Sequence, residues 1–269
     1  MSIQERLALW PALQRVRAQA PVVHNITNFV VMNTTANALL ALGASPVMAH
    51  AEEEMEDMVA IASALVLNIG TLSRHWVASM FKAAEAAMAK GIPIVLDPVG
   101  AGATPFRTVT VRELLSEMRP AIIRGNASEI LAIGGGLAKT KGVDSTAASV
   151  DALEAARALH EAHGAAVCIS GETDYIVGGD GVWQVHNGHR LMPKVTGLGC
   201  TATALCGAFA AVTPDRALAA TQAMTVMGLA GELAGDQAQG PGTLQLHFLD
   251  ALHNLSEADV QLRLRVERA

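Results

Sequence analysis

Aromatic and charged residues are scarce in this sequence. Aromatic residues make up 3% and charged residues 16% of its 269 residues, whereas hydrophobic residues make up 51%. A disordered chain has the opposite balance, because it carries many charges and too few apolar residues to form a core. The composition therefore excludes a disordered chain and predicts a well-packed protein, which we expect to form a single domain over residues 1–269.

An excess of positive charge is also missing. Lys and Arg number 19 against 25 for Asp and Glu, which gives a formal net charge of −6 at pH 7. A surface of this sign repels nucleic acid and anionic lipid. We therefore expect neither nucleic acid nor a membrane as the main partner.

Cysteine is rare, and the longest uncharged run is interrupted. The three cysteines, Cys168, Cys200 and Cys206, are an odd number without the spacing of a disulfide framework, which favours a reducing compartment. The first 21 residues alternate charge and apolar residues like an amphipathic helix and lack the apolar core of a signal peptide. Residues 195–213 carry no charge but contain three glycines, so we expect a buried helix there rather than a membrane span. These observations predict a cytoplasmic protein.

The sequence does contain a regular alternation of short apolar strands and helices. Strands are predicted at residues 64–70, 92–97, 121–124 and 165–169, and helices at residues 74–90, 126–133 and 152–162. At residues 175–185 the pattern changes to a hairpin around Gly-Gly-Asp-Gly, which predicts an antiparallel edge, and the chain after residue 200 is mostly helical. This order predicts an α/β fold with a mainly parallel sheet and helices on both faces.

Polar side chains follow the carboxyl ends of the predicted strands, where ligands bind in open α/β sheets. Asp97 ends the strand at residues 92–97, and Arg124 ends the strand at residues 121–124. Ser170 follows the strand at residues 165–169. We therefore expect these side chains to lie at one edge of the sheet.

A glycine-rich turn at residues 196–201 (TGLGCT) runs directly into an apolar helix. Its glycines let the backbone turn sharply, and we expect the amides of Gly199, Cys200 and Thr201 to point at one spot. Helix amino-terminal amides together with the helix dipole form an anion site. The turn therefore predicts a site for a phosphate group.

The combination of these residues suits phosphoryl transfer. Asp97 and Glu129 are carboxylates for Mg²⁺, Arg124 is a cation for phosphates, and the turn places the titratable Cys200 beside them. This reaction needs positioning and charge neutralisation more than covalent chemistry. Each residue also has a structural alternative that the sequence leaves open: Asp97 as a turn former, Arg124 in a surface ion pair, and Glu129 in a capping box with Asn126.

Two further patterns carry less weight. His186 and His189 have ligand-like spacing, but no nearby cysteines or acids complete a zinc site. Residues 197–202 fit a loose dinucleotide pattern, but no acidic residue ends a following strand as ribose binding requires. We expect neither a zinc site nor a dinucleotide site.

Five motifs resemble those of hydroxyethylthiazole kinase, which belongs to the ribokinase-like superfamily. They are residues 23–28 (VHNITN), 97–104 (DPVGAGAT), 124–129 (RGNASE), 196–200 (TGLGC) and 239–243 (QGPGT). They occur in the same order over about residues 22–252, nearly the whole chain. The resemblance implies a ribokinase-like α/β fold and an ATP- and Mg²⁺-dependent kinase that phosphorylates the hydroxyl of hydroxyethyl-methylthiazole in thiamine biosynthesis and salvage.

The resemblance also implies roles for the residues that match these motifs. The substrate side is formed by Asn25 and Met48 at the thiazole and by Gly197 at the hydroxyl, with Cys200 beside it. The ATP contacts are Arg124 and Ser170, and the anion hole comprises Gly197, Gly199 and Cys200. The residues that organise Mg²⁺ and its waters are Asp97, Glu129 and Asn126. The family is typically a homotrimer with the thiazole bound between subunits, a role that suits the Met-rich segment at residues 47–58.

The cysteine at position 200 departs from the superfamily pattern, in which most members carry an aspartate. An ordinary thiol is mostly protonated at pH 7. Our hypothesis is that Cys200 orients the substrate hydroxyl and accepts its proton late. The alternatives are another ribokinase-like vitamin or small-alcohol kinase, a non-enzymatic thiazole or nucleotide sensor, and a nucleotide-dependent nicotinamide-nucleotide hydrate dehydratase, which would keep an aspartate at position 200.

Overall fold

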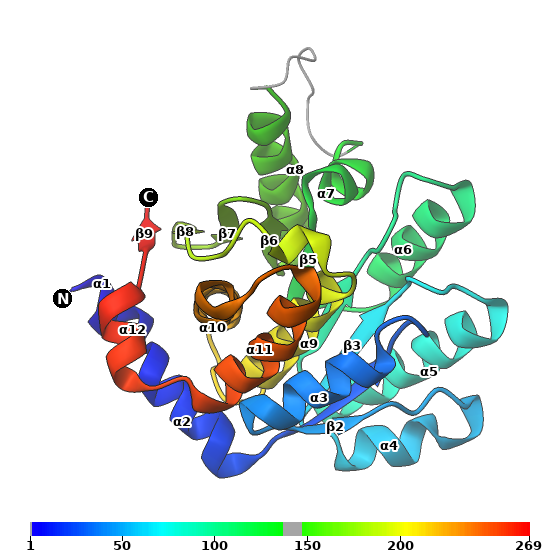
Figure 1. Ribbon diagram of the computed structural model, residues 1–269. Coiled ribbons are helices and arrows are strands. Elements are labelled where there is room, and N and C mark those ends of the chain that lie inside the picture. Colours follow the sequence, from blue (N-terminus) through cyan, green and yellow to red (C-terminus); the bar gives the residue numbers. More distant parts are fainter. Residues whose placement is uncertain (1, 137–146) are drawn as a thin grey trace.

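The computed structural model describes residues 2–136 and 147–269 (Figure 1). One sheet runs through this part of the chain in the order β2-β1-β3-β4-β5-β6-β7-β8-β9. Neighbouring strands from β2 to β6 are parallel, and those from β6 to β9 are antiparallel. The strands are β1 Val22–Ile26, β2 Ser45–Val47, β3 Ala64–Asn68, β4 Ile94–Asp97, β5 Ile122–Asn126, β6 Ala166–Ser170, β7 Asp174–Gly178, β8 Gly181–Val185 and β9 Val266–Arg268.

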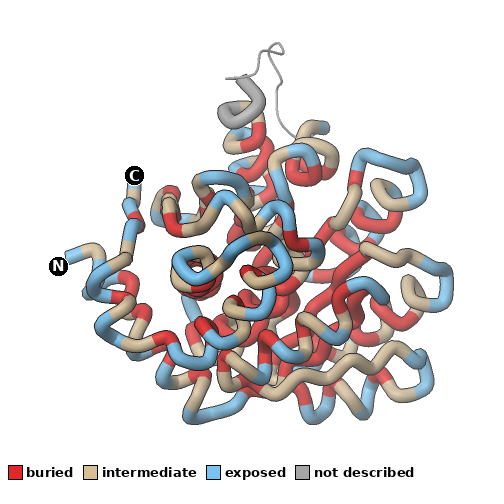
Figure 2. The backbone as a smooth tube through the Cα atoms, in the orientation of Figure 1, coloured by how far each residue is buried: buried red, intermediate tan, exposed pale blue. Residues whose placement is uncertain are grey.

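Helices cover both faces of the sheet. One face carries α1 Ile3–Leu7, α2 Leu9–Gln19, α3 Met32–Leu42, α9 Leu198–Ala210, α10 Arg216–Gln237, α11 Pro241–Asn254 and α12 Glu257–Arg263. The other face carries α4 Met55–Ile61, α5 Arg74–Lys90, α6 Pro105–Glu117, α7 Ala127–Gly134 and α8 Ala147–His163. Strand side chains alternate between the two layers: Val66 packs with the first set, whereas Leu65 and Leu67 pack with the second. Buried residues accordingly gather along the sheet between the helices (Figure 2).

The local predictions hold where short-range signals set the ends of an element. Helix α5 spans residues 74–90, because Ser73 caps its first turn by accepting from the amide of Trp76 and Gly91 ends it with a φ of 78°. The four predicted strands and the hairpin are confirmed as β3 to β8. Strand β4 begins only at Ile94 and not at residue 92 as predicted, but the carbonyl of Pro93 still accepts from the amide of Leu65 at 3.0 Å.

Two predictions are wrong, one about the amino-terminal segment and one about the edge of the sheet. The amino-terminal segment forms two helices, because Ala8 adopts a left-handed conformation with a φ of 44° and separates α1 from α2. The hairpin does not lie at the edge of the sheet, because β9 pairs with β8 and places Val266 opposite Val185. A strand of three residues is too short to show the alternation that identifies a strand in a sequence.

The uncharged run at residues 195–213 forms helix α9, which is buried from Thr201 to Phe209. Gly207 allows close packing on the sheet, because a Cβ there would lie 2.8 Å from Cγ2 of Val66. Within residues 2–136 and 147–269, no helix combines the length and hydropathy needed to span a membrane. The packing of α9 on β1, β3 and β4 directs its amino terminus to the carboxyl ends of the parallel strands.

Candidate active site

The carboxyl ends of the parallel strands bring together polar side chains that lie far apart in the sequence. Asp97 ends β4, Arg124 lies in β5, Ser170 ends β6, and Cys200 lies in the first turn of α9. In the strand register, Asp97 is opposite Asn68 of β3 and Ser170 is opposite Asn126 of β5. This edge of the sheet is the candidate active site.

Asp97 is fully buried and is held by one of its two oxygens. Its Oδ2 accepts hydrogen bonds from Nδ2 of Asn68 and from Oγ1 of Thr203, both at 2.7 Å. Its Oδ1 is also buried and has no partner among the described residues. Burial raises the pKa of Asp97 to about 6, although the charge of Arg124 opposes this rise. At neutral pH, Asp97 therefore presents a charged oxygen that is free to bind.

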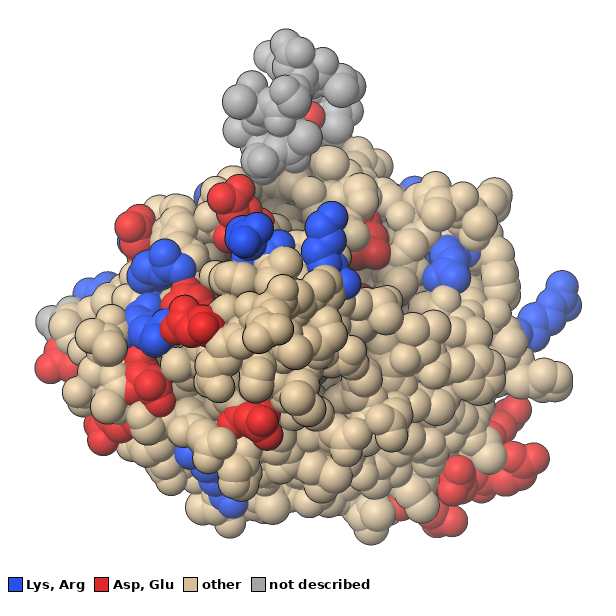
Figure 3. All heavy atoms as spheres, in the orientation of Figure 1, with Lys and Arg blue, Asp and Glu red and all other residues tan. Residues whose placement is uncertain are grey.

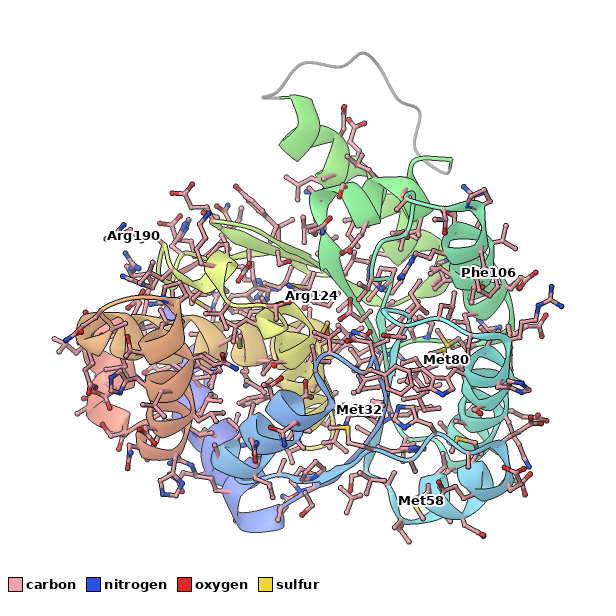
Figure 4. All side chains as sticks on the ribbon, turned by 45° about the vertical axis from the view of Figure 1, so that its right-hand side comes forward. Met32, Met58, Met80, Phe106, Arg124 and Arg190 are labelled. Atoms are coloured by element: carbon pink, nitrogen blue, oxygen red, sulfur yellow. The ribbon has the colours of Figure 1, made fainter. Side chains whose placement is uncertain are left out.

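Arg124 is fixed beside the start of α9. Its Nη2 donates to Oγ of Ser170 at 2.6 Å, and its Nε is buried without a partner in the described residues. Burial disfavours its charge, but Asp97 and other nearby acidic groups outweigh burial and raise the pKa of Arg124. Arg124 is half-buried, and Figure 4 labels it near the middle of the view and Arg190 at the periphery. None of the ion pairs among the described residues involves Arg124, so the alternative of a surface ion pair is wrong.

Glu129 and Asn126 form the capping box of α7. The amide of Glu129 donates to Oδ1 of Asn126 at 3.0 Å, and the amide of Asn126 donates to Oε2 of Glu129 at 2.8 Å. The other carboxylate oxygen of Glu129 accepts from the amide of Gly100 at 2.8 Å. The capping-box alternative is thus confirmed, while a role in organising Mg²⁺ stays a prediction. Glu129 ties the loop after β4 to the first turn of α7.

The first turn of α9 provides the backbone amides of the predicted anion site. Gly197 caps the helix in a left-handed conformation with a φ of 87°, and a Cβ there would lie 2.7 Å from Cγ1 of Val31. The amides of residues 197–200 have no acceptor within the helix. Our prediction for Thr201 is wrong, because its amide donates to the carbonyl of Gly197 at 2.9 Å. The amides available to an anion therefore lie in residues 197–200.

Cys200 is half-buried and accepts a hydrogen bond from Nδ2 of Asn28 at 3.4 Å. Burial raises its pKa to about 11 and the charge of Asp97 adds to the rise, while the nearby amides of Asn68 and Asn28 partly offset it. Cys200 is a neutral thiol at pH 7, and Cys168 and Cys206 lie in the hydrophobic core.

Three buried side chains of the site are not among the site residues predicted from the sequence. Asn28 is the last residue of a motif, and Asn68 and Thr203 lie inside apolar elements. Asn68 nevertheless leaves a signal, because it is the single polar residue in the apolar segment at residues 64–70. A buried amide or hydroxyl needs a partner, so such a residue marks a polar network.

The strand order separates the predicted thiazole residues from the predicted ATP residues. Asn25 lies in β1 and Met48 follows β2, whereas Arg124 and Ser170 lie on β5 and β6. Asn25 is fully buried; its Nδ2 donates to the carbonyl of Val23 at 2.8 Å, and its Oδ1 has no partner in the described part of the chain. Asp97 on β4 lies between the two groups.

The described residues contain no group of three or more His, Cys, Asp or Glu side chains placed to hold a metal ion. Nδ1 of His186 lies 3.1 Å from Oγ1 of Thr173, and its Nε2 lies 4.0 Å from Glu267. A metal at the candidate site would therefore depend on few protein ligands.

Two cavities of the described structure lie away from the candidate site. One of about 450 Å³ adjoins Trp183 and Arg268, and one of about 840 Å³ lies along α5.

Comparisons with known proteins identify the family of this chain. The sequence model of the hydroxyethylthiazole kinase family matches residues 13–258. The hydroxyethylthiazole kinase of Syntrophus aciditrophicus is 61% identical over 96% of each chain, and that of Leptospira biflexa is 55% identical over 95% of this chain and 96% of the relative. The structure of the hydroxyethylthiazole kinase protein from Pyrococcus horikoshii OT3 has a TM-score of 0.90 at 45% identity and covers 97% of this chain and 99% of that chain.

More distant structures share the fold alone. Pyridoxal kinase from Staphylococcus aureus in complex with pyridoxal superposes with a TM-score of 0.67 at 16% identity, over 92% of this chain and 97% of that chain. This likeness confirms the predicted ribokinase-like α/β fold. The family match and the identities over nearly the full length lead to one conclusion. The chain belongs to the hydroxyethylthiazole kinase family.

Proposed function

We propose that this protein transfers the γ-phosphoryl group of ATP to the hydroxyl of hydroxyethyl-methylthiazole, a step of thiamine biosynthesis and salvage. One observation carries this proposal: the free oxygen of Asp97, the guanidinium of Arg124 and the amides at the start of α9 lie at the same edge of the sheet. Phosphoryl transfer requires that charge be neutralised and that the reacting oxygens be positioned, and these groups do both.

Arg124 and Ser170 form the ATP side of the site in this proposal. Arg124 carries a charge that its surroundings stabilise, and Ser170 fixes the orientation of the guanidinium. The helix dipole of α9 and the amides of Gly197, Gly199 and Cys200 favour a phosphate at the same place. Positive potential from a side chain and from the backbone therefore converges where the phosphoryl group is transferred.

Asp97 and Glu129 fit a Mg²⁺ site of the kind that relies on few protein ligands. Mg²⁺ binds one or two carboxylates together with water and substrate phosphates. Oδ1 of Asp97 has no partner among the described residues and can serve as a metal ligand. Each oxygen of Glu129 accepts one amide hydrogen bond and retains a further lone pair. When bound, Mg²⁺ neutralises charge on the phosphates. Asn126 supports this arrangement by capping α7 and holding Glu129 in place.

We place the alcohol at Asn25, Met48, Gly197 and Cys200. Oδ1 of Asn25 is a buried acceptor without a partner in the described residues. Met48 is half-buried and directly follows β2, the strand next to β1, which carries Asn25. Because its pKa is raised to about 11, Cys200 meets the substrate as a thiol and orients the hydroxyl. The loose transition state of phosphoryl transfer requires little early proton removal. The proton therefore leaves the hydroxyl late and passes to an oxygen of the transferred phosphoryl group, because the thiol of Cys200 already carries its own proton.

We place the thiazole site between the subunits of a homotrimer. The cavity beside Gly197 has a volume of only about 20 Å³ in one chain, far below the roughly 300–1,000 Å³ of a typical ligand pocket. Phe29 and Val30, which follow the VHNITN motif, are 68% and 65% exposed, and Leu40 of α3 and Leu246 of α11 are also exposed. The face over α3 and α11 carries few charges (Figure 3). An exposed apolar face beside an incomplete pocket supports a site that a neighbouring copy completes.

Two coarser features also support the proposal. All three cysteines are free thiols, which suits a reducing compartment, and we place the reaction in the cytoplasm. One continuous sheet joins strands from both ends of the described chain, and we infer a single domain.

Coupled ADP release with ATP and Mg²⁺ tests this function. The alcohols to compare are hydroxyethyl-methylthiazole, hydroxymethyl-pyrimidine and ribose. Turnover that depends on the thiazole alone is the expected result. Turnover with another alcohol would overturn the substrate assignment and keep the phosphoryl transfer. Absence of turnover from a folded protein that binds ATP would favour the dehydratase or the sensor.

A further inference from the structure

A chain of buried hydrogen bonds connects the thiol of Cys200 with the carboxylate of Asp97. Nδ2 of Asn28 donates to Sγ of Cys200 at 3.4 Å and to Oδ1 of Asn68 at 2.9 Å. Nδ2 of Asn68 in turn donates to Oδ2 of Asp97 at 2.7 Å. The four side chains come from the loop after β1, from β3, from β4 and from α9, so this series of hydrogen bonds joins four separate parts of the fold.

The carboxylate fixes the direction of every hydrogen bond in this chain. A carboxylate oxygen only accepts, so Asn68 must turn its NH₂ group toward Asp97. The carbonyl oxygen of Asn68 then faces Asn28, where it also accepts from the amide of Gly70 at 2.9 Å. Asn28 must therefore present its NH₂ group to Asn68, and the same group reaches Cys200.

The surroundings allow little freedom to these two amides. Asn28 and Asn68 are 4% and 1% exposed, so an unpaired polar atom there would be costly. Oδ1 of Asn28 accepts from the amide of Val30 at 3.2 Å, which agrees with the same orientation. Gly70 packs directly against Asn28, because a Cβ there would lie 2.5 Å from Nδ2 of Asn28. Packing and hydrogen bonding therefore hold Asn28 against the sulfur.

We propose that Asn28 and Asn68 are positioning residues, which hold the sulfur of Cys200 as a hydrogen-bond acceptor at a fixed place relative to the free oxygen of Asp97. The inference rests on the proposed phosphoryl transfer to an alcohol. Asn28 donates to one side of the sulfur, so its N–H group fixes which part of the sulfur remains to orient the substrate hydroxyl. Asn68 donates to Asp97 and accepts from Asn28, so it holds Asn28 in a fixed orientation relative to Asp97 without touching the substrate.

A double-mutant cycle tests the connection with Cys200. Asn28→Leu removes the N–H donors at similar size, and we expect it to lower kcat about 10- to 100-fold, as loss of positioning does, with little change in the KM for ATP. In a Cys200→Ala background the same substitution should change kcat by less than about threefold, because its target is gone. Losses that multiply in the double variant would show that Asn28 acts independently of Cys200 and would overturn the proposal.

Gly70→Ala tests the same position without removing any hydrogen-bonding group. The new methyl group displaces Asn28, so kcat should fall as in Asn28→Leu, again only when Cys200 is present. Gly179→Ala is the matched control, because its Cβ would meet no atom closer than 3.8 Å and it lies in the turn between β7 and β8. Gln222→Met controls for stability, because it removes two buried hydrogen bonds far from the site. Unchanged kcat in a folded Gly70→Ala protein would contradict the proposal.

Each assay uses the alcohol that the wild-type enzyme phosphorylates. An alcohol other than the thiazole as substrate would correct the proposed function and leave this test intact. If the wild-type enzyme phosphorylates its alcohol but the substitutions at positions 28 and 200 lower kcat independently of each other, the positioning role is overturned and the proposed function is not.

Discussion

The guanidinium of Arg124 lies against the backbone of Gly199, so closely that a Cβ at position 199 would lie 2.9 Å from Nη1. Gly199 belongs to the first turn of α9, and Arg124 belongs to β5. The two sources of positive potential in the site, the side chain and the helix terminus, are therefore in direct contact. Any substitution that enlarges Gly199 must move the arginine or the helix.

Gly199→Ala should weaken ATP binding because it displaces Arg124 from the anion site. We expect the Kd for ATP to rise about tenfold, comparable to the loss of one hydrogen bond to a charged group. Isothermal titration calorimetry measures this change, with Gly179→Ala as the control of equal size. An unchanged Kd would mean that the phosphates bind elsewhere.

Arg124→Ala should separate nucleotide binding from alcohol binding. The substitution removes the guanidinium and leaves the ends of β1 and β2 intact, so the ATP Kd should rise about 10- to 100-fold while the affinity for the thiazole stays similar. Titration of each ligand separately gives both values. Equal losses for the two ligands would contradict the division of the site along the sheet.

Substitutions at Cys200 should distinguish orientation from proton transfer. Cys200→Asp should retain or increase turnover, because a carboxylate accepts a proton near neutral pH whereas a thiol with a pKa of about 11 does not. For Cys200→Ala, the contribution of a general base, about 10²- to 10⁴-fold, is an upper limit on the loss of turnover, and a neutral thiol that only orients the hydroxyl should contribute less. Steady-state kinetics decide the outcome. An inactive Cys200→Asp enzyme that binds ATP normally would contradict the assignment.

Asp97→Asn should stabilise the fold and abolish most of the activity. Burial raises the pKa of Asp97 from 3.8 to about 6, so the unfolded chain loses this proton first as the pH rises. The wild-type protein therefore loses stability between about pH 4 and pH 6, by up to about 3 kcal/mol, and the asparagine variant does not. Thermal unfolding at pH 4 and pH 8 should show a gain in Tm that grows with pH. A variant less stable than wild type at pH 8 would refute this account.

The sequence predicts those parts of the fold and site that depend on neighbouring residues or on a general rule of α/β sheets. Ser73 and Gly91 mark the ends of α5 locally, and the rule that ligands bind at carboxyl ends of strands places Asp97 and Arg124 at one edge. The prediction for Thr201 is wrong by one residue, because the start of α9 at Leu198 depends on how Gly197 packs against Val31.

The polar network around Asp97 could not be predicted in the same way. Its hydrogen bonds join residues 29 to 172 positions apart, and their partners follow from strand register and helix packing. Thr203 illustrates the difficulty, because a threonine inside an apolar helix usually bonds its own backbone, as it also does here with the carbonyl of Gly199. Only the tertiary structure shows that it also donates to Asp97.

The strand order has a consequence for the size of the molecules that the site accepts. Neighbouring strands lie about 4.8 Å apart, and β1 and β4 are separated by β3, so Asn25 and Asp97 lie on strands about 10 Å apart. The first turn of α9 lies over this span, because Cys200 contacts Asn28 after β1 and Thr203 contacts Asp97 at the end of β4. In the proposed function, an acceptor held at β1 must present its hydroxyl to this turn, so we expect turnover to depend on the length of the arm that carries the hydroxyl.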